Sequence, residues 1–357
     1  MLGSLIVQTP AVADPLTPTK IMLVGSSTTQ GSAGDYTWRY RFSKHLTANN
    51  VSVDFVGPSN QVFDNIRSAG STFVFNDAYA DPAFDRDHFA RWGGFVGTFS
   101  GYPTGAKDTI AAQVSAYQPD YVVVMLGLND LTWFSTRTPA AVAADMQTLV
   151  GKARAAKPNV RLVLAAIQPT KWAAGNADNA ARVAEYNQRL SDLAAASSTP
   201  TSPIAYVPQA AGYQPDFNVT PHDSYDGTHP NAHGEIRIAD AVADVFSAAF
   251  GIGPAYPLSL SGVTTGPVLP FQLTCTAGQN MARLQWTESP GATGYWFQRR
   301  LAGGTWDAQV YQLKFLTDNP LTNLYLTAGQ TYEYRLQAAK WYDKGVFSNV
   351  CSVTPYA

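Results

Sequence analysis

Between Lys20 and about Ala249, short runs of β-branched residues alternate with longer Ala-rich amphipathic stretches. This alternation is typical of a parallel sheet with helices on both faces, because parallel strands need a crossover connection. The predicted strands are Lys20–Val24, Val51–Gly57, Tyr121–Gly127, Arg161–Gln168 and Ile204–Pro208. The predicted helices are Tyr36–Ala48, Asp108–Tyr117, Pro139–Ala156, Asn176–Ala196 and Ala232–Phe250. We therefore expect an α/β domain with a doubly wound parallel sheet over residues 18–250.

The pattern changes after residue 250. Residues 251–267 are rich in Gly, Pro and Ser and carry no charge, which is typical of a linker. Residues 268–357 then show short alternating runs with turns about every ten residues, and this pattern predicts an all-β sandwich. The strands expected there are Met281–Trp286, Gly294–Arg299, Asn323–Thr327, Thr331–Ala338 and Ser348–Val353.

Charge and hydropathy limit the class of partner. The net charge is -2 and the basic residues are scattered, so the sequence lacks the basic surface that binds nucleic acid or anionic membranes. No run approaches the roughly 18 apolar residues that predict a membrane span. A neutral small molecule or a polysaccharide is the favoured partner, and the sequence does not indicate an oligomeric state.

Two features favour secretion. Ala11-Val12-Ala13 resembles a signal-peptidase site, so residues 1–17 are interpreted as a signal-peptide remnant, or otherwise as a disordered leader. The only cysteines, Cys275 and Cys351, lie near the two ends of the predicted sandwich, a placement that favours a disulfide formed in an oxidising compartment. Two buried free thiols are the alternative.

Two motifs suggest a nucleophile and a base. The turn Gly25-Ser-Ser-Thr-Thr-Gln-Gly31 follows the first strand and can present Ser27 at the carboxyl edge of the sheet, although such a turn is often only a loop. In Asp226-Gly-Thr-His229, a carboxylate three residues before a histidine can fix the ring's tautomer and stabilise the imidazolium. A surface histidine in a capping loop is the alternative.

Two further motifs suggest donors for an oxyanion. Asn129 follows the strand that begins at Tyr121, and its side-chain amide can point at a developing negative charge or can cap the next helix. The glycines of Arg91-Trp-Gly93-Gly94 allow a backbone N–H to approach a substrate closely, or form only a flexible turn.

In order and position these four motifs resemble the conserved blocks of the SGNH (GDSL-like) hydrolases, over roughly residues 18–250. The resemblance implies a flavodoxin-like fold, with Ser27 as nucleophile and Asp226 and His229 completing the catalytic set. It implies an oxyanion hole formed by Ser27, Gly93 (or Gly94) and Asn129, and no cofactor. We also expect no metal, because no third ligand of suitable spacing accompanies His229 and His233.

One position departs from the family pattern, since Ser26 stands where the family usually has Asp. This departure weakens the match and raises the alternatives of an altered activity or of Ser26 as nucleophile. The flanking glycines, aligned with the family motif, favour Ser27.

Further resemblances concern substrate and architecture. The stretch from Trp38 to Gly57 resembles secreted carbohydrate acetylesterases, which implies hydrolysis of short acyl esters, acetyl esters above all, on a saccharide through an acyl-enzyme. A lipase or lysophospholipase, or a binding or adhesion protein with a decayed site, is the alternative. Trp286, Tyr295 and the Leu326–Leu336 stretch resemble a fibronectin type III module, which implies a non-catalytic spacer.

Overall fold

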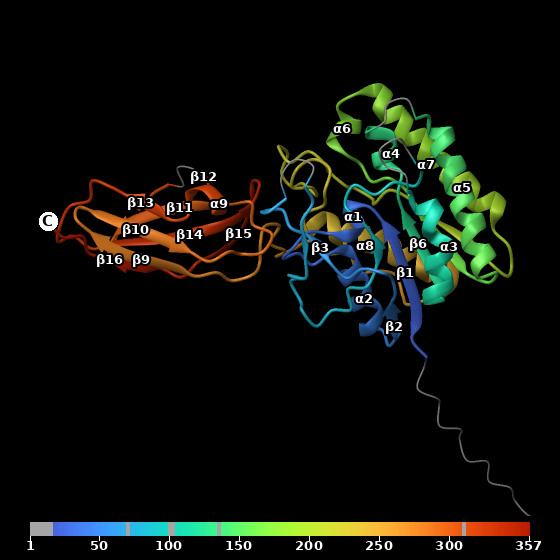
Figure 1. The fold of residues 1–357 in the computed structure, drawn as a ribbon, viewed down its shortest axis with the longest axis horizontal. Helices are drawn as coiled ribbons and strands as arrows, with labels where there is room; N and C mark the ends of the chain where they lie inside the picture. The colour runs from blue at the N-terminus through green and yellow to red at the C-terminus, as the bar shows by residue number, and fades with distance from the viewer. Residues whose placement is uncertain (1–16, 69–71, 99–103, 134–136, 309–311) are drawn as a thin grey trace, which may run out of the picture.

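The computed structural model describes residues 17–68, 72–98, 104–133, 137–308 and 312–357, so the predicted leader lies, except for its last residue, outside the described residues. A parallel sheet with the strand order β2-β1-β6-β7-β8 forms the centre of the N-terminal part, and β5 pairs with the end of β1 (Figure 1). Its strands are β1 (Thr19–Gly25), β2 (Val53–Phe55), β5 (Phe89–Ala90), β6 (Tyr121–Met125), β7 (Arg161–Ala165) and β8 (Ile204–Val207). The predicted doubly wound sheet is confirmed.

Helices cover both faces of this sheet. They are α1 (Ser27–Gln30), α2 (Trp38–Ala48), α3 (Ala106–Tyr117), α4 (Leu128–Thr132), α5 (Pro139–Ala156), α6 (Lys171–Ala174), α7 (Ala177–Ser197) and α8 (Ala232–Phe250). Val122 and Val124 of β6 pack in the core under α3, α5 and α7, whereas Val123 packs in the core under α2 and α8. Both faces are buried, which explains the continuous apolar runs in the sequence. No helix in the described ranges is long and apolar enough to cross a membrane.

The sheet order locates a crevice for ligands. The chain passes from β1 to β2 on one side and returns to β6 on the other, so the strand order reverses between β1 and β6. Open α/β sheets bind ligands outside the carboxyl ends of the strands at such a point. The predicted strand from Tyr121 to Gly127 stops earlier, at Met125, because Gly127 has φ 121° and turns the chain out of the sheet. A small hairpin, β3 (Val62–Phe63) and β4 (Phe75–Asn76), lies outside this sheet.

The C-terminal part, called here the β region (residues 271–353), consists of antiparallel sheets around one core. One sheet holds β9 (Leu273–Gly278), β10 (Met281–Trp286) and β13 (Leu321–Asn323). The other holds β11 (Gly294–Leu301), β12 (Gln312–Leu313), β14 (Tyr332–Lys340), β15 (Asp343–Phe347) and β16 (Cys351–Val353), and a short helix α9 (Phe315–Asp318) lies between β12 and β13. The predicted strand over residues 323–327 is wrong, because β13 ends at Asn323 and Tyr325 has φ 61°, outside extended geometry.

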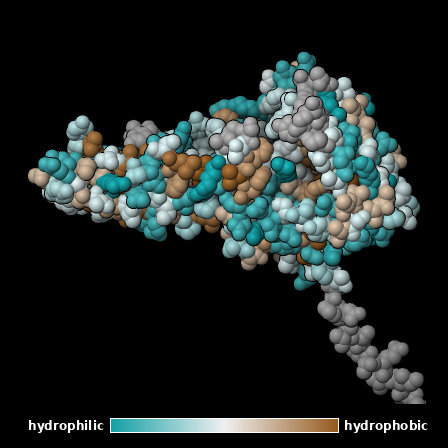
Figure 2. Space-filling view, viewed as in Figure 1, coloured by the Kyte–Doolittle hydropathy of each residue, from teal (hydrophilic) through white to brown (hydrophobic). Residues whose placement is uncertain are grey.

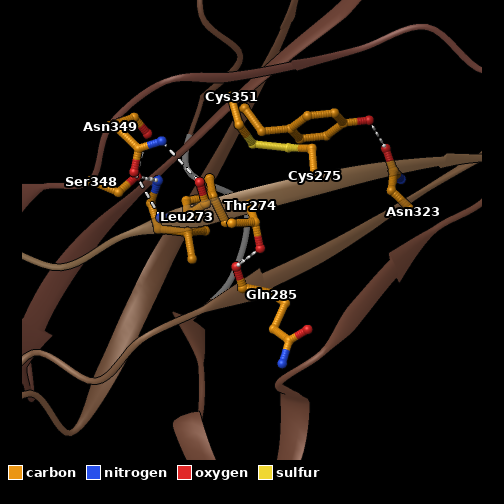
Figure 3. Close-up of a disulfide and its surroundings, with 10 residues drawn as sticks. Leu273, Thr274, Cys275, Gln285, Asn323, Ser348, Asn349 and Cys351 are labelled. Atoms are coloured by element: carbon orange, nitrogen blue, oxygen red, sulfur yellow. Dashed lines mark hydrogen bonds between the residues drawn. A yellow bond between two sulfur atoms is a disulfide. The ribbon is translucent and has the colours of Figure 1, made fainter.

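A disulfide between Cys275 and Cys351 joins the two sheets of the β region, as predicted (Figure 3). Cys275 lies on β9 and Cys351 on β16, with 5.9 Å between their Cα atoms. Beside the bond, the Asn349 side chain accepts from the Leu273 N–H (2.7 Å) and donates to the Leu273 carbonyl (2.8 Å). The cross-link and this amide pair hold the first and last strands together.

Reducing this disulfide is expected to destabilise the β region by about 4 kcal/mol, because a closed loop of this length restricts the unfolded chain. Calorimetry of the oxidised and the reduced protein would measure the shift in the melting temperature of the β region. Titration of the denatured, unreduced protein with Ellman's reagent provides the control. Two titratable thiols in that sample would contradict the bond.

Candidate active site

Ser27 follows the tight turn that ends β1. A Cβ at Gly25 would collide with the Thr29 side chain, so the turn requires glycine there. The N–H groups of Thr29 and Gln30 donate to the Ser26 carbonyl (3.1 and 2.9 Å), and α1 begins at Ser27. As the first residue of a helix, Ser27 has no intrahelical acceptor for its own N–H. The turn thus places both a hydroxyl and a backbone donor at the carboxyl edge of the sheet, where Ser27 lines a cavity.

The loop before α8 holds a histidine against a carboxylate. The Asp226 Oδ2 lies 2.7 Å from His229 Nδ1, and Oδ1 accepts the N–H groups of Thr228 (2.9 Å) and His229 (2.8 Å). Gly227 has φ 92°, which allows the loop to fold back on the carboxylate. Since Nδ1 faces Asp226, Nε2 is the nitrogen left for proton transfer.

The charge of Asp226 is maintained in this loop. Burial alone would raise its pKa, but the charge and hydrogen bond of His229 and the backbone N–H groups of Thr228 and His229 outweigh it. Together they lower the Asp226 pKa from 3.8 to about 2. The carboxylate is therefore ionised at any working pH and can stabilise a protonated imidazole.

Asn129 lies just after β6, at the neighbouring strand end. Its Nδ2 donates to the Gly94 carbonyl at 2.9 Å. A side-chain amide has two N–H groups, so one remains for a further acceptor. The alternative role as a helix cap is not adopted, because no side-chain cap is formed at the start of α4, where the capping position is Gly127.

The two glycines of the Arg91–Gly94 loop differ in the use of their N–H groups. The Gly94 N–H donates to the Arg91 carbonyl at 2.8 Å and is therefore occupied. Gly93 has φ 72°, and within the described residues no hydrogen bond uses its N–H. The geometry favours Gly93 over Gly94 as a donor to a bound ligand.

One cavity of about 320 Å³ brings these groups together. Its lining comprises Ser27, Trp92, Gly93, Leu128, Asn129, Thr132, Trp133, Thr170, Trp172, Thr228 and His229. Within the part of the chain that the structure describes, the Ser27 hydroxyl makes no direct hydrogen bond to His229. Such contacts are often long in unliganded enzymes and shorten when substrate binds.

A second, larger cavity of about 380 Å³ lies beside the first. Gly25 and Gly94 contribute to its wall, but neither Ser27 nor His229 does. Because the larger cavity lacks the serine and the histidine of the two motifs, the smaller cavity is the candidate active site.

Asp130 is a supporting residue that the sequence analysis missed. Its buried carboxylate accepts the N–H groups of Val96 (3.0 Å) and Gly97 (3.1 Å), and thereby ties the glycine loop to the end of β6. Burial raises the Asp130 pKa, and the two backbone donors act against that rise. Its position directly after Asn129 is the signal that could have found it.

Aromatic rings form a second kind of support that was missed. The Trp92 indole stacks on the His229 imidazole (centroids 4.3 Å apart) and on the Phe63 ring (3.7 Å). Tyr225 also stacks with His229, at 5.8 Å. No sequence signal distinguished Trp92 or Tyr225 from the many other aromatic residues of the chain.

The GDSL-like lipase/acylhydrolase family matches residues 23–235, which is more than half of the chain and contains all four motifs. The chain belongs to this family. It is accordingly a carboxylic ester hydrolase, and its parallel sheet and helices form the α/β fold of the SGNH hydrolases.

Several solved structures resemble this GDSL-like hydrolase. A mutant acetyl esterase with an acetate ion is 26% identical over 63% of this chain and 94% of its own, with a TM-score of 0.47. A family 3 carbohydrate esterase from Talaromyces cellulolyticus is 27% identical over 63% and 94%, with a TM-score of 0.47. A family 3 carbohydrate esterase from Clostridium thermocellum is 24% identical over 64% and 96%, with a TM-score of 0.48. Among curated proteins no match was found.

The structure bears on two alternatives raised by the sequence of the GDSL-like domain. They are Ser26 as the nucleophile, and a metal site that includes His229 and His233. Ser26 lines a small adjoining cavity with Met125 and Gln168, and is not among the residues that line the cavity that contains His229. His233 lies on α8, and in the described ranges no three His, Cys, Asp or Glu side chains are grouped as a metal site requires. The shared cavity of Ser27 and His229 favours Ser27 over Ser26 as the candidate nucleophile.

Proposed function

We propose that the protein is a secreted serine esterase that removes short acyl groups, acetyl above all, from carbohydrate through an acyl-enzyme. The observation that carries the proposal is the meeting of Ser27, Gly93, Asn129 and His229 at one cavity, with Asp226 bonded to the far nitrogen of the imidazole. A nucleophile, a base with its orienting group, and several hydrogen-bond donors are the complete set for acyl transfer.

In the first half-reaction, His229 Nε2 accepts the Ser27 hydroxyl proton while Oγ bonds to the ester carbonyl carbon. The N–H groups of Ser27 and Gly93 and the second N–H of Asn129 stabilise the oxyanion, each such donor being worth roughly 3 kcal/mol. The bond from carbon to the alcohol oxygen then breaks, and His229 returns its proton to the departing alcohol. In the second half-reaction water gives its proton to His229, attacks the acyl-enzyme and releases the acid, and His229 reprotonates Ser27.

The lining of the cavity supports a short acyl group and a sugar as the alcohol. Trp133 and Trp172 provide flat apolar faces, whereas the faces of Trp92 are already stacked on His229 and Phe63, and the threonines at positions 132, 170 and 228 provide hydroxyl groups. Apolar faces combined with a few placed polar groups suit a ring that carries many hydroxyls. A volume of about 320 Å³ leaves little space for a long acyl chain in addition to the alcohol.

We expect kcat/KM on p-nitrophenyl esters to fall on the order of 100-fold or more from acetate to palmitate, because a cavity of about 320 Å³ has little room for the longer chain. Acetate release from acetylated xylan would test the carbohydrate half of the proposal. Ser27→Ala measured in parallel defines the uncatalysed background. Equal or better hydrolysis of palmitate would instead favour a lipase or lysophospholipase.

We also propose that the β region is a fibronectin type III-like module, in line with the sequence resemblance. Trp286 and Tyr295 are buried with their ring centroids 5.7 Å apart, as the core pair of such a module would be. The Tyr332 hydroxyl accepts the Thr327 N–H at 3.1 Å, the type of bond that defines a tyrosine corner. The disulfide supports export to an oxidising compartment.

A further inference from the structure

The hairpin between β14 and β15 places two charged residues in an unusual environment. Lys340 and Asp343 flank the two-residue turn Trp341-Tyr342 and pair across it. Charged residues at a hairpin tip normally lie in water, yet only 2% of Lys340 and 4% of Asp343 is exposed. The N-terminal part, with its parallel sheet and helices, covers them and is called here the α/β region. Figure 2 shows hydrophobic residues gathered on the near face around the junction of the α/β region and the β region. The two flanking residues are therefore part of a buried contact, although the turn residues Trp341 and Tyr342 are themselves exposed.

Asp343 bonds to both ends of the loop that carries the proposed base. Its Oδ1 accepts from His222 Nε2 (2.8 Å) and its Oδ2 accepts from Asn231 Nδ2 (3.1 Å). His222 precedes that loop, and Asn231 follows it and caps α8 through the N–H groups of His233 and Gly234. A single carboxylate of the β region thus connects the two stems of the loop.

Lys340 supports the interior of the same loop. Its ammonium bonds to Asp35 Oδ2 (2.5 Å) and lies 4.3 Å from the centre of the Tyr225 ring. That ring stacks with His229, and the Tyr225 N–H donates to the His229 carbonyl at 3.1 Å. Contacts therefore run without interruption from Lys340 through Tyr225 to the imidazole.

We propose that Asp343 and Lys340 are positioning residues for catalysis, through which the β region fixes His229 relative to Ser27. This inference rests on the roles proposed above for those two residues. A misplacement of a reacting group by about 1 Å can lower the rate on the order of 100-fold. A loop that is held at both stems keeps His229 in place and so preserves the rate. The β region is then more than the spacer that its sequence resemblance implies.

The decisive variant is Asp343→Leu, which keeps the approximate shape of the side chain but removes both acceptors and so leaves the donors of His222 and Asn231 without this partner. We expect kcat to fall on the order of 10- to 100-fold, with KM within about twofold because the lining of the cavity is untouched. The rate at which a small fluorophosphonate labels Ser27 should fall by the same factor, since that reaction needs the serine activated by His229 but does not need the ester substrate.

Glu288→Leu is the matched control. Glu288 joins the same two regions through Arg67 (2.5 and 3.1 Å) but is not bonded to the loop. It should leave both rates within about twofold. An equal loss in Glu288→Leu, or unchanged rates in a folded Asp343→Leu, would overturn the proposal.

A second pair of variants covers the case in which Asp343→Leu does not fold. His222→Phe removes one stem bond, whereas His222→Gln places an amide N–H near the position of Nε2 and retains it. We expect the Phe variant to lose labelling rate and kcat and the Gln variant to regain most of both. Equal rates in the two variants would refute the clamp. If Ser27→Ala keeps its activity, the proposed function itself fails, and this outcome is distinct from failure of the clamp alone.

Discussion

Ser27→Ala is expected to lower kcat by on the order of a millionfold, which leaves only the small residual rate that binding and the oxyanion donors provide. The reason is that no acyl-enzyme can form without the hydroxyl, while the cavity and His229 remain in place. Initial rates on p-nitrophenyl acetate measure the loss, and a fluorophosphonate should no longer label the protein. Intact labelling of the variant would contradict the assignment.

Ser26→Ala is the matched control for that measurement. Ser26 is as buried as Ser27 and adjacent to it, but it lies outside the cavity that contains His229. Its carbonyl, and not its hydroxyl, makes the bonds that shape the turn. Most activity should therefore remain, and losses in the opposite order would move the nucleophile to Ser26.

Asp226→Asn is expected to lower kcat on the order of 10⁴-fold. The amide can donate to Nδ1 and favour the wrong tautomer, and it cannot stabilise the imidazolium that forms during the reaction. Steady-state kinetics on the acetyl ester would measure the effect. Asp216→Asn, in which a partly exposed carboxylate loses its ion pair with Lys171, serves as the control and should retain most of the activity.

The same Asp226 variant carries a stability signature. The pKa of Asp226 is lower in the folded protein, about 2, than the value of 3.8 expected in the unfolded chain. Its charge therefore stabilises the fold above about pH 4, by on the order of 2 kcal/mol, and this stabilisation is lost as the pH falls toward 2. Denaturant unfolding at several pH values would show it. The wild type should be more stable than the variant at neutral pH, and the difference should close in acid.

Much of the α/β part follows from local sequence signals. The helix from Pro139 to Ala156 is predicted with the correct bounds because Thr138 caps its start and Lys157-Pro158 ends it. The sheet is predictable because its strands are buried on both faces and read as unbroken apolar runs. The serine turn and the Asp226–His229 loop are short, so their internal spacing already constrains their geometry.

What the sequence could not reveal depends on contacts between distant residues. Trp92 and Tyr225 are more than a hundred positions apart, and nothing local indicates that both rings stack with His229. The bond between Asp343 and His222 likewise spans 121 positions and two regions. Strand β15 was missed for another reason, since Lys344 and Gly345 interrupt its apolar alternation.

The rings stacked with His229 restrict how the proposed reaction can proceed. With an indole 4.3 Å from its centre and a phenol ring also stacked with it, the imidazole cannot turn over about its Cβ–Cγ bond without striking a neighbour. Its carboxylate partner would also be lost in the flipped orientation. Small displacements within the ring plane remain available. In each half-reaction, Nε2 of His229 then both accepts the proton and delivers it. The oxygen that gives up the proton and the oxygen that receives it must therefore approach this one nitrogen in turn, while the ring keeps its orientation.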